Sequence, residues 1–300
     1  MPSITAIILT YNEEKHIARC IASLQQVCAR ICIIDSYSTD RTVEIAQSMG
    51  AEIFVHTWEN NHSKQINWGI QAINVQTPWT MRIDADEYLS LDLQAEIKQQ
   101  LDAVSPQVSG IEFTRKVIFK EKWIRFGGFY PIYLLRLWRS GKGSCEQRLM
   151  DEHIVLSEGD TIRFKGQLVD ENLNSFHWWV LKHNNYARRE AADALNQKYQ
   201  FSYMTDLVAS GSGQAQLKRR AKNSFYNRLP LGIRAVLYFI FRFVFQFGFL
   251  DHPKVWFFHF MQGLWYRLLV DINIYEAEKA GKNDPALIKS IISDQWKIEL

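Results

Sequence analysis

The chain has 300 residues, of which 47% are hydrophobic and 22% charged, and its formal net charge is +3. These values exclude a disordered chain and allow one large domain, or one domain with an appendage. The four cysteines match no zinc or redox spacing, so we expect buried thiols in a reducing cytoplasm, and we expect no signal peptide.

Strand and helix patterns alternate through the first part of the chain. Apolar runs predict buried strands at residues 4–9, 31–34, 52–55 and 79–83. Helical periodicity lies between them at residues 17–24, 43–49 and 66–73. This alternation predicts an α/β fold with a Rossmann-like, mostly parallel open sheet and helices on both faces. Further strands are expected at residues 111–119 and 133–138, and a long helix over residues 172–200.

Polar clusters follow three of the predicted strands. Thr10-Tyr11-Asn12-Glu13 follows the first, Asp35 to Asp40 the second, and Asp84-Ala85-Asp86 the fourth. Because the carboxyl ends of parallel strands share one edge of a sheet, these clusters predict a nucleotide crevice. Asp84 and Asp86 can converge on a divalent cation, although a lone Asp-x-Asp is more often a solvated turn or a helix N-cap. No dinucleotide or P-loop glycine pattern is present.

Four motifs in this order resemble the inverting glycosyltransferases of family 2, which have a GT-A fold. They are Thr10 to Glu13, Asp35 to Asp40, Asn67-Trp68-Gly69 and Asp84-Ala85-Asp86. The resemblance implies a metal-dependent hexosyltransferase that uses a nucleotide-sugar donor. Many relatives have two adjacent acids after the second strand, whereas here Ser36 follows Asp35; UDP is the expected nucleotide.

The same resemblance implies roles for individual residues. Thr10, Tyr11 and Glu13 are expected to line the nucleoside pocket, with Asp35 facing uracil or ribose. Asp84 is expected to approach the ribose and the metal, and Asp86 to ligate Mg²⁺ or Mn²⁺ at the diphosphate. For Lys64, contact with the diphosphate and a solvated helix face are equally good interpretations.

The acceptor hydroxyl must lose a proton, which calls for a general-base carboxylate. The acidic pair Asp151-Glu152 is the candidate, with a slight preference for Asp151. Single displacement of this kind inverts the anomeric centre. Neighbouring His153 is more simply read as a structural histidine. Five aromatic residues could stack on sugar rings, although for each of them packing in the core is the better interpretation. These residues are Trp123, Tyr130, Trp138, Trp178 and Trp179.

The domains are predicted as a GT-A catalytic domain over residues 1–210 and a helical, membrane-associating region over 216–300. The catalytic domain divides into a nucleotide-sugar half, about 1–110, and an acceptor half, about 111–210. Residues 216–270 carry nine basic side chains and one acid, a net charge of +8, and residues 225–266 hold fifteen aromatics. Arginines interrupt the apolar run 229–250, which favours a helical pair at an anionic membrane surface over a spanning helix. A buried hairpin or a dimer interface is the alternative.

Such a region suggests a lipid-linked acceptor. Along its length the chain resembles bacterial lipopolysaccharide inner-core β-1,4-glucosyltransferases, which implies a UDP-glucose donor, a heptose acceptor and a peripheral position at the cytoplasmic face of the inner membrane. Transfer to another surface glycan or a polyprenyl-linked acceptor is the first alternative, and a non-catalytic membrane-bound scaffold of this fold the second. No nucleic-acid partner is expected. The sequence leaves open the donor sugar, the metal and the oligomeric state.

Overall fold

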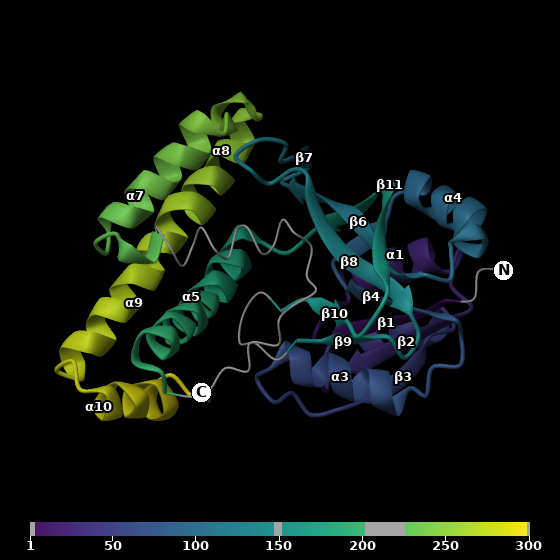
Figure 1. Ribbon diagram of the computed structural model, residues 1–300, viewed down its shortest axis with the longest axis horizontal. Coiled ribbons are helices and arrows are strands. Elements are labelled where there is room, and N and C mark those ends of the chain that lie inside the picture. The colour runs from purple at the N-terminus through teal and green to yellow at the C-terminus, as the bar shows by residue number, and fades with distance from the viewer. Residues whose placement is uncertain (1–3, 147–151, 202–225, 299–300) are drawn as a thin grey trace.

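The computed structural model describes residues 4–146, 152–201 and 226–298 (Figure 1). Strands and helices alternate in its first part. These elements are β1 (Ile4–Thr10), α1 (Ile17–Leu24), β2 (Arg30–Asp35), α2 (Thr42–Ser48), β3 (Glu52–Val55), α3 (His62–Ala72), β4 (Trp79–Asp84), β5 (Glu87–Leu89), α4 (Leu91–Gln100) and the 3₁₀ turn η1 (Leu101–Ala103). The next part is mainly strands and ends in a long helix. Its elements are β6 (Val108–Phe119), β7 (Lys122–Trp123), β8 (Ile132–Arg139), β9 (Gly143–Cys145), β10 (Ile154–Leu156), β11 (Asp160–Glu171) and α5 (Phe176–Tyr199).

Within the described residues, nine strands form one sheet in the order β3-β2-β1-β4-β8-β6-β11-β5, with β7 paired to β6. The first four strands of this order run parallel, as the sequence predicts. Beyond them, β8 is antiparallel to both β4 and β6, and β5 is antiparallel to β11. In the same part, β11 is parallel to β6. The sheet is therefore mixed, and the prediction of a mostly parallel sheet holds for its first half and for the β6–β11 pair. No helical crossover joins β6 to β8, so the chain returns antiparallel.

Helices cover both faces of the sheet because successive side chains of a strand point to opposite sides. Ile8 of β1 packs in a cluster with residues of α1, α2 and α4, whereas Ile7 packs in a second cluster with Ile66 of α3. This two-sided burial confirms the predicted Rossmann-like arrangement. Trp138 lies in the second cluster and is fully buried, so its ring packs in the core and is not available to a sugar.

The C-terminal part is helical. Its elements are the 3₁₀ turn η2 (Tyr226–Arg228), α7 (Ile233–Ile240), the π turn η3 (Phe241–Phe245), the 3₁₀ turn η4 (Gly248–Leu250), α8 (Pro253–Phe260), the π turn η5 (Met261–Trp265), α9 (Tyr266–Ala280), α10 (Pro285–Ser290) and the π turn η6 (Ile291–Gln295). Figure 1 shows α9 alongside α5, away from the sheet. Ala187, Ala191 and Leu195 of α5 form a separate core with Val270 and Ile274 of α9. The long helix is thus shared between the sheet and the C-terminal helices.

The apolar run 229–250 does not form one helix. It breaks at Phe247, which has a positive φ of 60°, and at the buried Gly248 that follows. Among the described helices, none combines the length and the low polarity needed to cross a membrane. The run instead forms α7 and η3, and the chain then turns back as α8.

Three of the tail arginines point into the protein, whereas Arg228 is exposed. Arg234 and Asp271 form a buried pair, and the side chain of Arg267 lies 2.6 Å from Glu190 of α5. Arg242 donates to the carbonyl oxygen of Gly127 and lies over the ring of Phe129. Arg234 and Arg267 are therefore paired with internal carboxylates, whereas Arg242 is bound by an uncharged carbonyl oxygen.

Many other side chains of the tail are apolar and exposed. We name this set the apolar face, and it consists of Ile233, Val236, Leu237, Ile240, Phe241, Val244, Phe245, Phe247, Phe249, Leu250, Trp256, Phe257 and Phe260. Phe257 is 70% exposed and Phe245 68% exposed. Along α7 and η3 these residues recur every three to four positions, which places them on one side of that helix. Exposed apolar surface of this kind usually marks an interaction site.

Candidate active site

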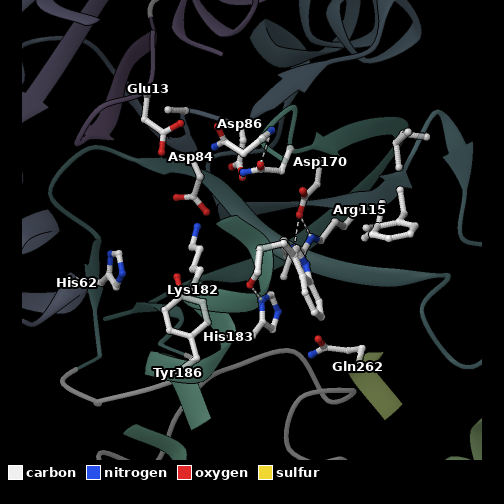
Figure 2. Close-up of a pocket in the computed structure, with 18 of the residues that line it drawn as sticks. Glu13, His62, Asp84, Asp86, Arg115, Asp170, Lys182, His183, Tyr186 and Gln262 are labelled. Carbon is white, nitrogen blue, oxygen red and sulfur yellow. Dashed lines mark hydrogen bonds and ion pairs between the residues drawn. The ribbon is translucent and has the colours of Figure 1, made fainter. Parts of the chain in front are cut away.

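A cavity of about 520 Å³ opens at the carboxyl ends of the central strands. The loop after β1 and the end of β4 form one side of it, β6 and β8 contribute to its floor, and α5 closes the opposite side (Figure 2). Phe258 and Gln262, from the C-terminal helices, complete the wall. The cavity therefore joins the sheet, where sequence analysis placed the site, to the tail.

The ends of β1 and β2 are tied together beside this cavity. The Thr10 hydroxyl donates to Asp35 at 2.8 Å, and the backbone amide and hydroxyl of Ser38 donate to the same carboxylate at 2.8 and 2.6 Å. Asp35 is 2% exposed, so this carboxylate holds the strand ends in place. Tyr11 and Tyr37 are more than 60% exposed at this edge, where an aromatic ring is open to a flat ligand.

Glu13 reaches the cavity from the loop after β1 and is oriented by His16. The Nδ1 atom of His16 lies 2.6 Å from the Glu13 carboxylate, while its Nε2 atom accepts a hydrogen bond from the backbone amide of Leu173. Because Nε2 accepts, the proton of a neutral His16 sits on Nδ1 and is donated to Glu13. The buried histidine thus fixes the position of a cavity carboxylate.

Asp84, at the end of β4, is held between two arginines. Its oxygens lie 3.5 Å from Arg82 and 2.9 Å from Arg136, and its side chain keeps 40% exposure toward the cavity. Desolvation acts to raise the pKa of Asp84, but Arg136 and Arg82 hold that pKa well below its usual range. Arg136 also pairs with buried Glu87, whose pKa is raised by burial to about 7. The network presents Asp84 as a charged, fixed acceptor.

Asp86 lines the cavity two residues further on, where the Asn172 amide donates to it at 3.0 Å. Among the described residues, no group of three or more His, Cys, Asp or Glu side chains could hold an ion by itself. Mg²⁺ is commonly bound by one or two carboxylates and completed by phosphate oxygens. Asp84 and Asp86 fit such a cation if it binds together with a phosphorylated ligand.

Glu152, a candidate for the general base, lies in the cavity, whereas Lys64, the candidate for the phosphate contact, does not. Glu152 lines the cavity with 12% exposure and accepts from Arg82 at 3.3 Å, while Asp151 lies outside the described residues. His153 lines the cavity as well. Lys64 is 47% exposed, pairs with Glu59 and does not line the cavity, as expected for a solvated helix face.

Residues 5–150 match the family model described as "Glycosyl transferase family 2". The chain carries a family 2 glycosyltransferase domain. Lipopolysaccharide core biosynthesis glycosyltransferase LpsC of Rhizobium meliloti is 29% identical over 205 residues, which cover 63% of this chain and 70% of LpsC. An uncharacterized glycosyltransferase of Rickettsia typhi is 38% identical over 98 residues. That match covers 33% of this chain and 32% of the relative, so the chain spans about a third of the length of that protein.

Among solved structures, glucosyl-3-phosphoglycerate synthase from Mycobacterium tuberculosis is 16% identical to this chain, with a TM-score of 0.32. The match covers 38% of this chain and 44% of that one. The match to the family model ends at residue 150, so α5 and the tail, which close the cavity, lie outside the matched residues.

Sequence analysis missed several cavity residues around the family 2 domain. Arg115 and Asp170, from the neighbouring strands β6 and β11, form a close pair there, and burial raises the pKa of Asp170. Arg136 and Asn172 hold the two acids of the Asp-x-Asp motif. Lys182 enters from α5. These residues carry no motif. For Arg115 and Arg136 the only signal available was a charged side chain within a largely apolar strand, and Asp170, Asn172 and Lys182 gave no such signal.

Proposed function

We propose that this protein is an inverting glycosyltransferase that moves glucose from UDP-glucose to a lipid-linked acceptor, a heptose of the lipopolysaccharide inner core. The observation that carries the proposal is the cavity, which gathers Glu13, Asp84, Asp86 and Glu152 from distant parts of the sequence. The family 2 domain supports the reaction class, and the similarity to LpsC supports the acceptor class.

The donor side of the cavity suits a nucleoside diphosphate. Bound Mg²⁺ or Mn²⁺ supplies charge neutralisation for the diphosphate, and Asp84 and Asp86 are the residues that would hold it. The nucleoside would lie at the tied strand ends, with the exposed Tyr11 ring beside the base and Thr10, Glu13 and Asp35 shaping the pocket.

The acceptor side supplies the base. Glu152 is the member of the acidic pair that the described structure places in the cavity, and Arg82 holds it while also contacting Asp84. Arg82 therefore sets the spacing between the base and the donor side. The base takes the proton of the acceptor hydroxyl as that oxygen attacks the anomeric carbon, and the configuration inverts in this single step.

The apolar face supports a peripheral position at the cytoplasmic face of the inner membrane. Part of it lies on α8, which also contributes Phe258 to the cavity, and this suits an acceptor with an apolar anchor. A variant with both Phe245→Ser and Phe257→Ser should sediment less with vesicles that contain anionic lipid. Leu91→Ser is the matched control, because Leu91 is 81% exposed on α4. Equal sedimentation of the two variants would remove the membrane proposal.

The first test of the function is calorimetric titration of the purified protein with UDP, with and without Mn²⁺, and with GDP and NAD as controls. Metal-dependent UDP binding supports the proposal, and transfer of labelled glucose to heptose-terminated lipopolysaccharide then tests the acceptor. Glu152→Gln should abolish transfer and leave UDP binding intact; if transfer persists, the base is Asp151. A protein that binds no nucleoside diphosphate refutes the donor assignment.

A further inference from the structure

Lys182 is a cation of the cavity that has no ion-pair partner among the described residues. The three cavity arginines are all committed: Arg82 to Asp84 and Glu152, Arg115 to Asp170, and Arg136 to Asp84 and Glu87. Lys182 lines the same cavity from α5 (Figure 2). Its ammonium group is hydrogen-bonded to the Tyr186 side chain, and its remaining N–H donors are available to an incoming anion.

The helix holds this ammonium group in place. Trp178 and Tyr186 lie one turn before and one turn after Lys182, so all three share one side of α5. The Nζ atom lies 4.7 Å from the centre of the Trp178 ring and 5.7 Å from that of Tyr186. Contacts of a cation with aromatic faces are attractive and restrict a long side chain that would otherwise be mobile.

Lys182 faces the acidic side of the cavity. Figure 2 shows its amino group pointing across the cavity toward the side that carries Glu13, Asp84 and Asp86. Burial acts to lower the pKa of Lys182, but Tyr186 and the carboxylates of Asp86 and Glu13 outweigh burial and raise that pKa. The side chain is therefore a protonated donor at neutral pH.

From this geometry we infer that Lys182 binds the diphosphate of the donor and stabilises it as the leaving group. The inference rests on the proposed function and adds a residue to it. When the bond between the anomeric carbon and the phosphate oxygen breaks, its electron pair stays on that oxygen, and the diphosphate gains negative charge. Lys182 donates hydrogen bonds to this charge without giving up its proton, from the side opposite Asp86. The diphosphate then lies between a lysine on α5 and the Asp-x-Asp motif on β4.

Sequence analysis considered this contact for Lys64. That lysine instead forms an ion pair with Glu59 at the surface. The cation comes instead from a helix that begins about 90 residues after the Asp-x-Asp motif and packs on the tail. Donor binding and the C-terminal helices are therefore physically connected through α5.

The test compares ligands with and without phosphate. UDP, uridine and inorganic pyrophosphate are titrated with Mg²⁺ into the full-length protein and into Lys182→Gln, Lys182→Arg and Lys198→Gln. Lys182→Gln should weaken UDP and pyrophosphate binding by about 10- to 100-fold and leave uridine binding unchanged, since a hydrogen bond to a charged group is lost. Lys182→Arg should retain most of the affinity. Lys198, on the same helix but paired with Glu278 at the surface, should tolerate its change.

Two results would overturn the inference while the proposed function stands. The first is UDP binding that Lys182→Gln does not change. The second is an equal loss of uridine and UDP binding in Lys182→Gln, which indicates a structural role. A wild-type protein that binds neither UDP nor pyrophosphate overturns both the inference and the proposed donor.

Discussion

The buried pair of Arg234 and Asp271 should stabilise the tail strongly. Asp271 accepts from Arg234 Nε at 2.7 Å and from the backbone amide of Gly232 at 2.7 Å, and the two charged side chains are 6% and 4% exposed. At this burial a lost partner leaves an uncompensated charge, which costs about 3–5 kcal/mol, compared with about 0–1 kcal/mol for a surface pair. Asp271→Ala should therefore lower the free energy of unfolding by about 3–5 kcal/mol.

Urea denaturation of Asp271→Ala, Arg234→Met and the double variant Arg234→Met/Asp271→Leu measures this effect. The double variant removes both charges and should lose only about 1–3 kcal/mol, because the Gly232 amide is then the group left without its acceptor. Losses that add up in the double variant would refute the reasoning. The reasoning would also be refuted if Arg234→Met kept the stability of the wild type but bound anionic vesicles less well, because Arg234 would then face the lipid.

Three further predictions concern the cavity and its surroundings. Asp86→Ala should abolish metal-dependent UDP binding in calorimetry, and unchanged binding would contradict the metal assignment. Gly127→Ala should destabilise the protein by about 1–3 kcal/mol more than Gly141→Ala. Both glycines have a positive φ, but only at Gly127 would a new Cβ meet a buried ring, 2.6 Å from Cε1 of His259. Equal losses of stability in thermal denaturation would contradict this packing. Burial lowers the pKa of His183 from 6.5 to about 4. The folded protein therefore favours the neutral imidazole, and this contribution to the free energy of unfolding is fully present above pH 6.5. It decreases as the pH falls toward 4, by up to about 1.4 kcal/mol per pH unit. In urea titrations His183→Gln should flatten that pH dependence, and an unaltered slope would exclude His183 as its source.

Elements with a long, regular pattern could be predicted from the sequence. β3 lies at the predicted residues, and α1 and β4 differ from prediction by at most one residue. α4 and β11 were not predicted. In α4 only Leu93 and Ile97 are buried, so its periodic signal spans a single turn. β11 carries its buried residues between charged ones, and its strand identity depends on pairing with β6 and β5.

For the site, sequence analysis could name the acids but not their counter-ions. The spacing of Asp84 and Asp86 after a buried strand is a local signal, and the structure places both in the cavity. Arg136 reaches Asp84 only because β8 lies antiparallel beside β4, and Lys182 arrives only because α5 packs against α9. Such contacts depend on tertiary packing, and no periodicity or motif in one sequence encodes them.

The helix α8 acts as a wall of fixed thickness. Phe257 is 70% exposed on the apolar face, whereas its neighbour Phe258 is 8% exposed and lines the cavity. One helix, about 10–12 Å in diameter, therefore borders both the apolar face and the cavity. Under the proposed function, with the apolar face on lipid, we expect this short span to select acceptors by reach: a hydroxyl close to its apolar anchor enters the cavity, while one far out along a glycan chain passes beyond the opening.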